Sequence, residues 1–293
     1  MNWPTGVGQR IYLNSMKKTF SIFHANGGAG NVRGIQVAEY LGAKRNPESG
    51  YEDDICIYVK IIPPENFPKH SYLDVVDSAR AIDFLKNHPS MGVIAISRVA
   101  QEYLMKVLKR NDVIFIPHHH CNYERFVRLD REVKTVGIIG SKTAFQYPVD
   151  KFRKELAKIG LDLLYDEDHW KHYNNDSNEE GKDSREKVVR FYKKIDVQVV
   201  YRPEWISTYE PLRSPLKLEN AGSFSIPTVA YPEPSYMDEW KECFIPNVAI
   251  TGLLKSVERL KIDPLFYRNM ADISKRKAEE YHIKNVSKLY LNL

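Results

Sequence analysis

The chain has 293 residues, which is enough for one large domain or two of modest size. Hydrophobic residues make up 43% and charged residues 28%, as in ordinary globular proteins, and the 12% aromatic content argues against disorder. The net charge of +5 is small and the basic residues are dispersed, so the composition permits an anionic ligand without requiring one.

Three cysteines, Cys56, Cys121 and Cys243, lie far apart and form no CxxC pair. This spacing argues against a disulfide framework or a zinc knuckle. No apolar run reaches the roughly 18 residues of a transmembrane helix. We therefore expect a cytoplasmic protein without a transmembrane segment, and peripheral association with a membrane stays open.

In the first half of the chain, short β-branched runs alternate with amphipathic stretches. Continuous apolar runs are typical of strands buried on both faces of a parallel sheet. Helical spacing marks residues 31–44 and 98–111 as helices. The predicted strands are residues 19–25, 54–62, 72–76, 92–97 and 112–117.

The pattern restarts after residue 130. Strands are predicted at 135–140, 161–166 and 196–201, with helices at 150–160 and 185–195, a polar surface loop at 172–184, and two final helices at about 246–260 and 264–291. The restart predicts an α/β protein with two Rossmann-like domains, residues 1–130 and 131–293. Ligands of such sheets bind beyond the carboxyl ends of the strands, so the cleft between the domains is the expected site.

The glycine-rich segment HANGGAGN (24–31) follows a predicted strand and opens a predicted helix. Gly28 and Gly30 would let the backbone turn tightly and present amides to an anion at the start of the helix. The spacing differs from G-x-G-x-x-G, so a dinucleotide fingerprint is weak. A plain tight turn and a ligand-facing loop both remain open here.

The segment GIIGSKTAFQYP (137–148) places Ser141 and Lys142 after the first strand of the second half. A phosphate-binding loop belongs at this position in a Rossmann-like sheet. Lys142 could therefore neutralise a phosphate, or it could be an ordinary loop lysine.

The segment RSPLKLEN (213–220) carries the sharpest signal. Lys217 stands between two leucines, so its helical turn is predicted to be partly buried. Ser214 is the predicted N-cap, with Pro215 at the first helical position. Lys217 and Asn220 are three residues apart and share a helix face.

A cation and an amide on one face near the start of a helix suit a diphosphate and a neighbouring sugar hydroxyl. Glu219, on an adjacent face, could instead accept hydrogen bonds from ribose hydroxyls. Pairing of Lys217 with a carboxylate is the structural alternative.

The run PHHHCN (117–122) suggests a metal site only superficially. Adjacent residues of an extended segment point in opposite directions, so at most His118 and His120 could share an ion, and no third ligand is evident. We interpret the run as a loop at the domain junction with one histidine near the cleft, and we expect no metal.

The segment from Ser214 to Trp240 resembles the nucleotide-sugar-binding segment of GT-B glycosyltransferases, particularly the large retaining family 4, glycosyl transferases group 1. That family reads roughly P-L-K-L-x-E-x-x-A-x-G-x-P-V-V-A. Its ribose-binding glutamate falls on Asn220 and its late glycine on Ser225, which are departures from the pattern. The matching residues are Pro215, Leu216, Lys217, Leu218, Pro227, Val229 and Ala230.

The resemblance covers most of residues 20–293 and implies the GT-B fold, with two domains facing a central cleft and a C-terminal helix that crosses back to the first. It implies a metal-independent, cofactor-free transfer from a UDP, GDP or TDP sugar to a glycan, lipid-linked or small-molecule acceptor. Lys217 and Lys142 would then stabilise the leaving diphosphate. If the reaction inverts, Asp77 or His24 could be the base, and Arg202 could meet the nucleotide base or the phosphates.

Other functions stay open. The departures at Asn220 and Ser225 would also suit a degenerate, non-catalytic nucleotide-sugar-binding protein. A nucleotide-sugar epimerase or a phage-type DNA glucosyltransferase of the same fold is a further alternative, although the sequence has no concentrated basic patch for DNA.

Overall fold

The structure is a computed structural model and describes residues 18–128, 132–140, 145–166, 180–203 and 210–293. Residues 129–131, around the predicted domain boundary, lie outside this set.

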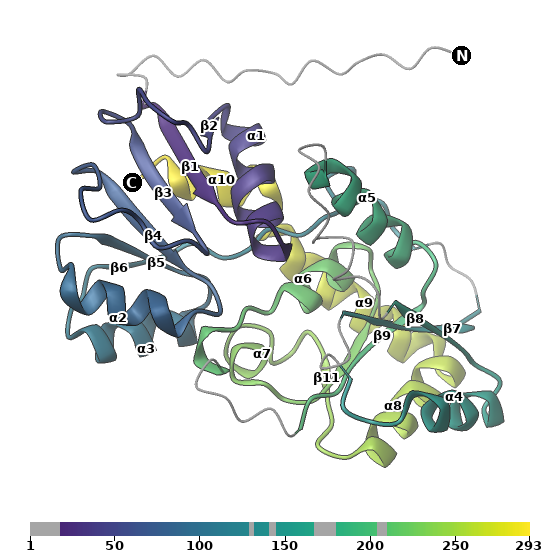
Figure 1. Ribbon diagram of the computed structural model, residues 1–293. Helices are drawn as coiled ribbons and strands as arrows, with labels where there is room; N and C mark the ends of the chain where they lie inside the picture. Colours follow the sequence, from purple (N-terminus) through teal and green to yellow (C-terminus); the bar gives the residue numbers. More distant parts are fainter. Residues whose placement is uncertain (1–17, 129–131, 141–144, 167–179, 204–209) are drawn as a thin grey trace, which may run out of the picture.

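Six parallel strands form the sheet of the first lobe, in the order β2-β1-β3-β4-β5-β6 (Figure 1). All five strands predicted for this half are present, and β2 is a short addition at the edge. The strands are β1 (Phe20–His24), β2 (Lys44–Arg45), β3 (Ile55–Val59), β4 (Ser71–Val75), β5 (Gly92–Ala95) and β6 (Val113–Phe115). The connecting helices are η1 (Gly30–Gln36), α1 (Val37–Leu41), α2 (Ala79–Asn87) and α3 (Arg98–Leu108).

The predicted helix over 31–44 differs in kind from the observed one. Its first part, η1, is a π-helix, and α1 ends at Gly42, which adopts the left-handed conformation with φ of 68°. The helix α2 was not predicted. Ser78 is its N-cap, and the Ser78 side chain accepts a hydrogen bond from the Ala81 amide at 3.3 Å.

Five parallel strands form the sheet of the second lobe, in the order β11-β10-β9-β7-β8. The strands are β7 (Thr135–Ile139), β8 (Asp162–Asp166), β9 (Val197–Val200), β10 (Thr228–Ala230) and β11 (Ile245–Pro246). The helices are α4 (Val149–Lys158), α5 (Glu180–Tyr192), η4 (Glu210–Leu212), α6 (Leu216–Ser223), α7 (Pro234–Glu239), α8 (Ile250–Ile262) and α9 (Pro264–Glu279). Because α5 starts at Glu180, the predicted loop over 172–184 is wrong in its last part, and residues 172–179 are outside the described set.

The chain returns to the first lobe at its C-terminus. The predicted helix 264–291 breaks after α9, and α10 (Ile283–Tyr290) packs against the first sheet (Figure 1). Ile283, Val286 and Tyr290 are buried in one cluster with Phe20 and Ile22 of β1. Two Rossmann-like sheets with a C-terminal helix crossing back confirm the predicted fold class.

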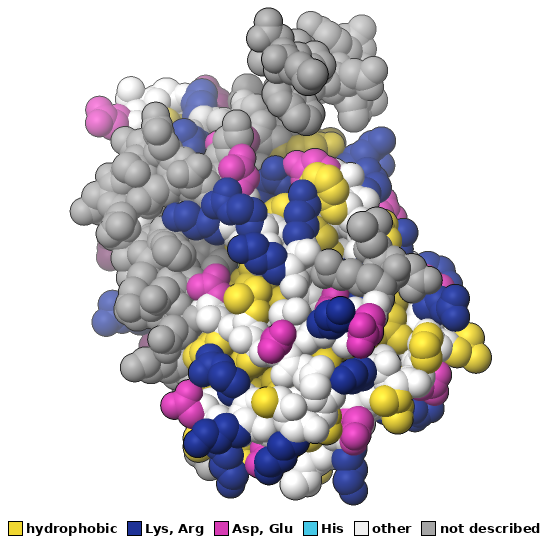
Figure 2. All heavy atoms as spheres, turned by 90° about the vertical axis from the view of Figure 1, so that its right-hand side faces the viewer, with side chains coloured by type: hydrophobic (Ala, Val, Ile, Leu, Met, Phe, Trp, Pro, Cys, Tyr) yellow, Lys and Arg dark blue, Asp and Glu magenta, His cyan; other side chains and the backbone are white. Residues whose placement is uncertain are grey.

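The surface carries mixed charge. On the face in Figure 2, Lys and Arg side chains are interspersed with Asp and Glu side chains. Within the described part of the chain, no helix combines the length and the apolar character that crossing a bilayer requires.

Candidate functional site

Lys217 lies in the first turn of α6, at the carboxyl edge of the second sheet. Its Nζ donates a hydrogen bond to the carbonyl oxygen of Ile139, the last residue of β7, at 2.8 Å. Burial lowers the pKa of Lys217 to about 7, and the nearby Arg202 cation contributes to the lowering. The half-buried amine is therefore held in place by a backbone partner, in a position where an anion would favour its charged form.

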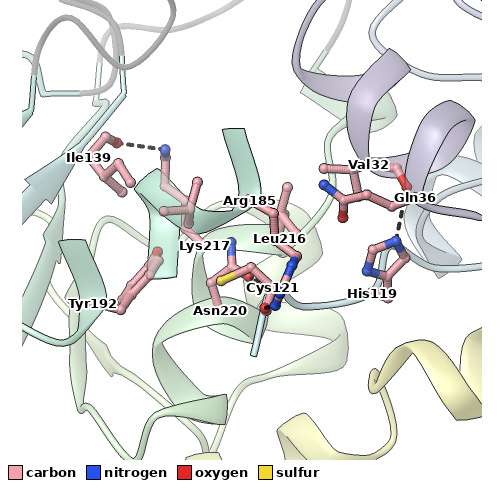
Figure 3. A pocket seen from close by; sticks show the side chains of 11 residues that line it. Val32, Gln36, His119, Cys121, Ile139, Arg185, Tyr192, Leu216, Lys217 and Asn220 are labelled. Atoms are coloured by element: carbon pink, nitrogen blue, oxygen red, sulfur yellow. Dashed lines mark hydrogen bonds between the residues drawn. The ribbon is translucent and has the colours of Figure 1, made fainter. Parts of the chain in front are cut away.

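A cavity of about 90 Å³ lies between the two lobes beside Lys217 (Figure 3). Arg185 of α5 closes one side, where its Nη1 donates to the Cys121 carbonyl at 2.8 Å. The expected shared face of α6 is present, because Lys217 and Asn220 both line this cavity. Its wall in the first lobe includes Val32, Gln36 and His119.

Asn220 ties α6 to the segment between the two sheets. Its Oδ1 accepts a hydrogen bond from the Cys121 amide at 2.8 Å, and the residue is buried. Asn220 thus has a structural partner although it stands where the resembling family has its ribose-binding glutamate.

Glu219 is directed elsewhere. Its side chain is fully buried, neither carboxyl oxygen has a hydrogen-bond partner among the described residues, and it does not line the cavity. Burial raises the pKa of Glu219 well above its usual range, Glu239 adds to the rise, and Arg33 opposes it. Of the two residues considered for a ribose contact, the fold therefore brings Asn220 to the cavity wall.

The start of α6 corrects one local prediction. The helix begins at Leu216, Pro215 occupies the N-cap position with φ of −79° and ψ of 22°, and no side chain caps it. The predicted capping by Ser214 is therefore wrong, because the turn is closed by the Pro215 carbonyl, which accepts from the Leu218 amide at 2.8 Å.

Ser225 stands at the family's glycine position and adopts a φ of 60°. This left-handed conformation is the one that glycine takes most readily. Ser225 therefore departs from the family pattern in its side chain, while its backbone keeps a conformation that suits a glycine.

Arg202 follows β9 and is held by a carboxylate that the sequence analysis missed. Its Nε donates to Glu233 Oε1 at 2.6 Å and its Nη2 donates to Glu233 Oε2 at 2.5 Å. Arg213 Nη1 lies 3.8 Å from the same oxygen, Glu233 Oε2. The sequence signal for Glu233 is its position just after the short apolar run PTVAY (227–231), which forms β10 beside β9, so that Glu233 and Arg202 lie at one sheet edge.

The first lobe contributes His24 and Asp77 at the carboxyl edge of its sheet. His24 Nδ1 is 3.3 Å from the Ala25 carbonyl, and burial lowers the pKa of this histidine. Partial burial raises the pKa of Asp77, while the cations of Lys60, Arg213 and Arg202 oppose that rise. The one ion pair described for Asp77 is with Lys60 of its own lobe, at 4.0 Å, and neither His24 nor Asp77 lines the cavity beside Lys217.

The two glycines predicted in the donor site have different surroundings. A Cβ at Gly30 would lie 1.8 Å from the Ala25 carbonyl oxygen, so the turn before η1 admits no side chain there. A Cβ at Gly28 would meet nothing within 4 Å. Close packing therefore explains why residue 30 is a glycine, whereas no steric contact requires a glycine at position 28.

Ser141 and Lys142 lie outside the described residues. The residue before them, Gly140, has φ of 127°, a conformation that side chains rarely adopt.

The three histidines after β6 are buried at the junction of the lobes, where the sequence placed them. His119 Nε2 is 2.9 Å from the Val32 carbonyl and lines the cavity, whereas His118 Nδ1 has no partner in the described part of the chain. Among the described residues, no three His, Cys, Asp or Glu side chains come together as a metal site would require.

The sequence matches no protein-family profile and no curated protein. Among solved structures, HepE from Anabaena in complex with UDP and glucose matches with a TM-score of 0.60 and 9% identity, over 94% of this chain and 98% of that chain. A glycosyltransferase from Rickettsia africae matches with a TM-score of 0.57 and 10% identity, over 94% and 97%.

The apo form of the lipopolysaccharide outer core galactosyltransferase WaaB matches with a TM-score of 0.52 and 13% identity, over 94% of this chain and 98% of that chain. In the GtfA/B complex, this protein matches only 52% of the length of the chain to which it is similar. These matches show that the chain has the GT-B fold, which confirms the expected resemblance at the level of the fold.

Proposed function

We propose that the chain is a glycosyltransferase that moves a sugar from a nucleotide-diphosphate sugar to an acceptor hydroxyl. The observation that carries the proposal is the half-buried amine of Lys217, which lines the cavity at the carboxyl edge of the second sheet in a GT-B fold. HepE, which has the same fold, is seen in complex with UDP-glucose.

In this mechanism the bond between the sugar C1 and the diphosphate oxygen breaks, and negative charge builds on the leaving diphosphate. Protonated Lys217 stabilises that charge. The guanidinium of Arg202, which Glu233 holds in place just after β9, contributes a second positive charge. The acceptor oxygen forms the new bond to C1 and loses its proton, which passes to the leaving diphosphate if the configuration is retained, or to a basic side chain of the first lobe if it is inverted. For an inverting reaction, Asp77 and His24 are the candidate bases, since both lie at the carboxyl edge of the first sheet.

The cavity beside Lys217 holds only part of a donor, since about 90 Å³ is well below the roughly 300–1,000 Å³ of small-molecule pockets. We place the diphosphate at Lys217 and the amides after β7, and a sugar hydroxyl or the ribose near Asn220. Ser141 and Lys142 remain proposed phosphate contacts of the loop that follows β7.

A non-catalytic nucleotide-sugar-binding protein is the second candidate. The observation in its favour is Asn220, whose Oδ1 is already engaged by the Cys121 amide instead of being open to a ribose. Donor binding without release of nucleotide diphosphate, in water and with every acceptor tried, would favour this alternative.

A donor panel tests the proposal. UDP-, GDP- and TDP-sugars are added to the protein, and both the melting temperature and the release of nucleotide diphosphate are measured. At a donor concentration of 100 Kd we expect about 2.7 kcal/mol of stabilisation, seen as a rise of several degrees, together with slow hydrolysis of one donor. If no donor shifts the melting temperature and none is hydrolysed, the proposed function is wrong.

A further inference from the structure

The hydrogen bonds around the cavity beside Lys217 decide which kind of atom it can hold. Both lobes enclose it, with Gln36 and His119 on one side and Lys217 and Asn220 on the other (Figure 3). Only 7% of Gln36 and 8% of Asn220 are exposed. The groups that these two amide side chains present to the cavity are therefore fixed by their partners in the protein.

Both amide side chains keep their NH2 groups for the cavity. A backbone amide can only donate, so the Asn220 atom that lies 2.8 Å from the Cys121 nitrogen is the oxygen, Oδ1. The oxygen of Gln36, Oε1, accepts from the Tyr123 hydroxyl at 2.8 Å. Neither Asn220 Nδ2 nor Gln36 Nε2 has a hydrogen-bond partner in the described part of the chain. Because both residues line the cavity, these NH2 groups can donate to an occupant.

The acceptors of the described cavity wall are already in use. The Tyr192 hydroxyl is bonded to Gln198 Oε1 at 2.6 Å. Burial lowers the pKa of His119 to about 4, so its ring is neutral and the proton lies on Nε2, which faces a carbonyl. No Asp or Glu side chain is among the described residues of the wall. Three backbone carbonyls accept from side chains of the same wall: Ile139 from Lys217 and Cys121 from Arg185 at 2.8 Å, and Val32 from His119 at 2.9 Å.

A cavity with this lining favours oxygens that only accept. A phosphate oxygen is such a group, whereas a hydroxyl also carries a proton that needs an acceptor. A ribose hydroxyl beside Asn220 could accept from Nδ2, but its proton would lose the water that it binds in solution, so the hydroxyl would add little to the affinity. A carboxylate at this position would instead accept from the hydroxyl in a charge-assisted hydrogen bond and would select for it.

We propose that the nucleotide site does not select for the 2′-hydroxyl of ribose. Its ligands then include 2′-deoxyribonucleoside diphosphates and their sugars as well as the ribonucleoside forms, and Asn220 is the residue that sets this tolerance. The inference rests on the proposed function, which places a ribose near Asn220. The lining of the cavity with hydrogen-bond donors is its chemical basis.

The variant N220D tests the inference, because aspartate has nearly the shape of asparagine. Its Oδ1 can still accept from the Cys121 amide, while its second oxygen replaces the NH2 group with an acceptor. K86Q is the control, since it changes the net charge by the same amount at an exposed lysine of α2. Circular dichroism and the melting temperature verify that both variants are folded.

Titration calorimetry at pH 6, where Lys217 is charged, measures the binding of UDP, GDP, their 2′-deoxy forms and pyrophosphate. In the wild type and in K86Q, we expect the ribo and deoxy forms of the nucleotide that binds to differ by less than about threefold. N220D should bind pyrophosphate about tenfold more weakly, because its carboxylate repels the phosphates, and should prefer the ribo form about tenfold. A disturbance of packing alone would weaken both forms equally and leave their ratio unchanged.

Two results would overturn the inference and leave the proposed function intact: a wild-type preference of about tenfold or more for the ribo form, or an unchanged ratio in N220D. The absence of binding by every nucleoside diphosphate would remove the proposed function, and the tolerance for deoxyribose with it. Pyrophosphate then distinguishes the remaining cases. Binding that N220D weakens and K86Q does not would retain the donor-lined cavity as an anion site, whereas equal binding by wild type and N220D, or none, would remove that as well.

Discussion

A buried arginine–carboxylate pair lies at the carboxyl edge of each sheet, Arg33–Asp74 in the first lobe and Arg202–Glu233 in the second, and the two pairs are built differently. In the second lobe, Glu233 meets Arg202 with both oxygens, at 2.6 and 2.5 Å. In the first lobe, Asp74 meets Arg33 with a single oxygen, and one oxygen and one nitrogen remain without partners in the described structure. A complete pair satisfies the hydrogen bonds of the carboxylate, whereas an incomplete one leaves buried polar atoms unsatisfied, which costs stability.

Breaking the two pairs separately tests this contrast and should have the largest effect. D74N removes the counterion of Arg33, whose side chain is only 1% exposed. We therefore expect a loss of about 3–5 kcal/mol in the free energy of unfolding. E233Q should destabilise less, because Arg202 keeps the Tyr236 hydroxyl at 3.3 Å. Urea denaturation measures both, and a greater loss for E233Q would contradict the comparison.

Removing the amine of Lys217 should have the next largest effect. K217M should reduce donor turnover by about 2–4 kcal/mol of transition-state stabilisation, roughly 30-fold to 1,000-fold, with the fold retained. K261M is a matched control, because Lys261 Nζ also donates to backbone carbonyls, those of Ile159 at 2.6 Å and Gly160 at 3.0 Å, at the opposite edge of the same sheet. Equal turnover in K217M and K261M would remove Lys217 from the mechanism.

Asn220 separates a structural role from a ligand-binding one. N220A leaves the buried Cys121 amide without its acceptor, so we expect a loss of about 1–3 kcal/mol in the free energy of unfolding. If Asn220 acts only as this tie between α6 and the inter-sheet segment, the affinity for UDP stays within twofold of the wild type. A tenfold loss of UDP affinity would instead assign it a contact with the nucleotide.

The smallest expected effect is a pH dependence of diphosphate binding. With a pKa of about 7, Lys217 loses most of its charge between pH 6 and pH 8, and the diphosphate binds the charged form. We expect the affinity for UDP to fall up to about tenfold over this range in the wild type, relative to K217M. Parallel curves for the two proteins would show that the amine does not titrate in the site.

The same lowered pKa has an effect of definite sign on stability. The unfolded chain, in which Lys217 titrates near 10.5, binds more protons than the folded protein between pH 7 and 10.5. The contribution of Lys217 to stability therefore rises with pH through this window. Below pH 7 both states are protonated and the burial of the charge remains unfavourable.

The sequence by itself determined the alternation of strands and helices, and with it the α/β class, because strands buried on both faces require continuous apolar runs such as ICIYV in β3. It also placed Lys217 and Asn220 on one helix face, since a spacing of three is a local property of any helix. The resemblance around Lys217 indicated the GT-B fold.

Only the tertiary structure decided the partners of these side chains. Whether the amine of Lys217 meets Ile139, or Asn220 meets Cys121, depends on segments 78 and 99 residues away in the chain. The burial of Glu219, the pairing of Arg202 with Glu233 and the unpartnered oxygen of Asp74 follow from contacts across sheets and lobes, which periodicity and spacing do not encode. Local pattern fixes the elements, whereas long-range packing fixes the electrostatic environment on which the chemistry of a site depends.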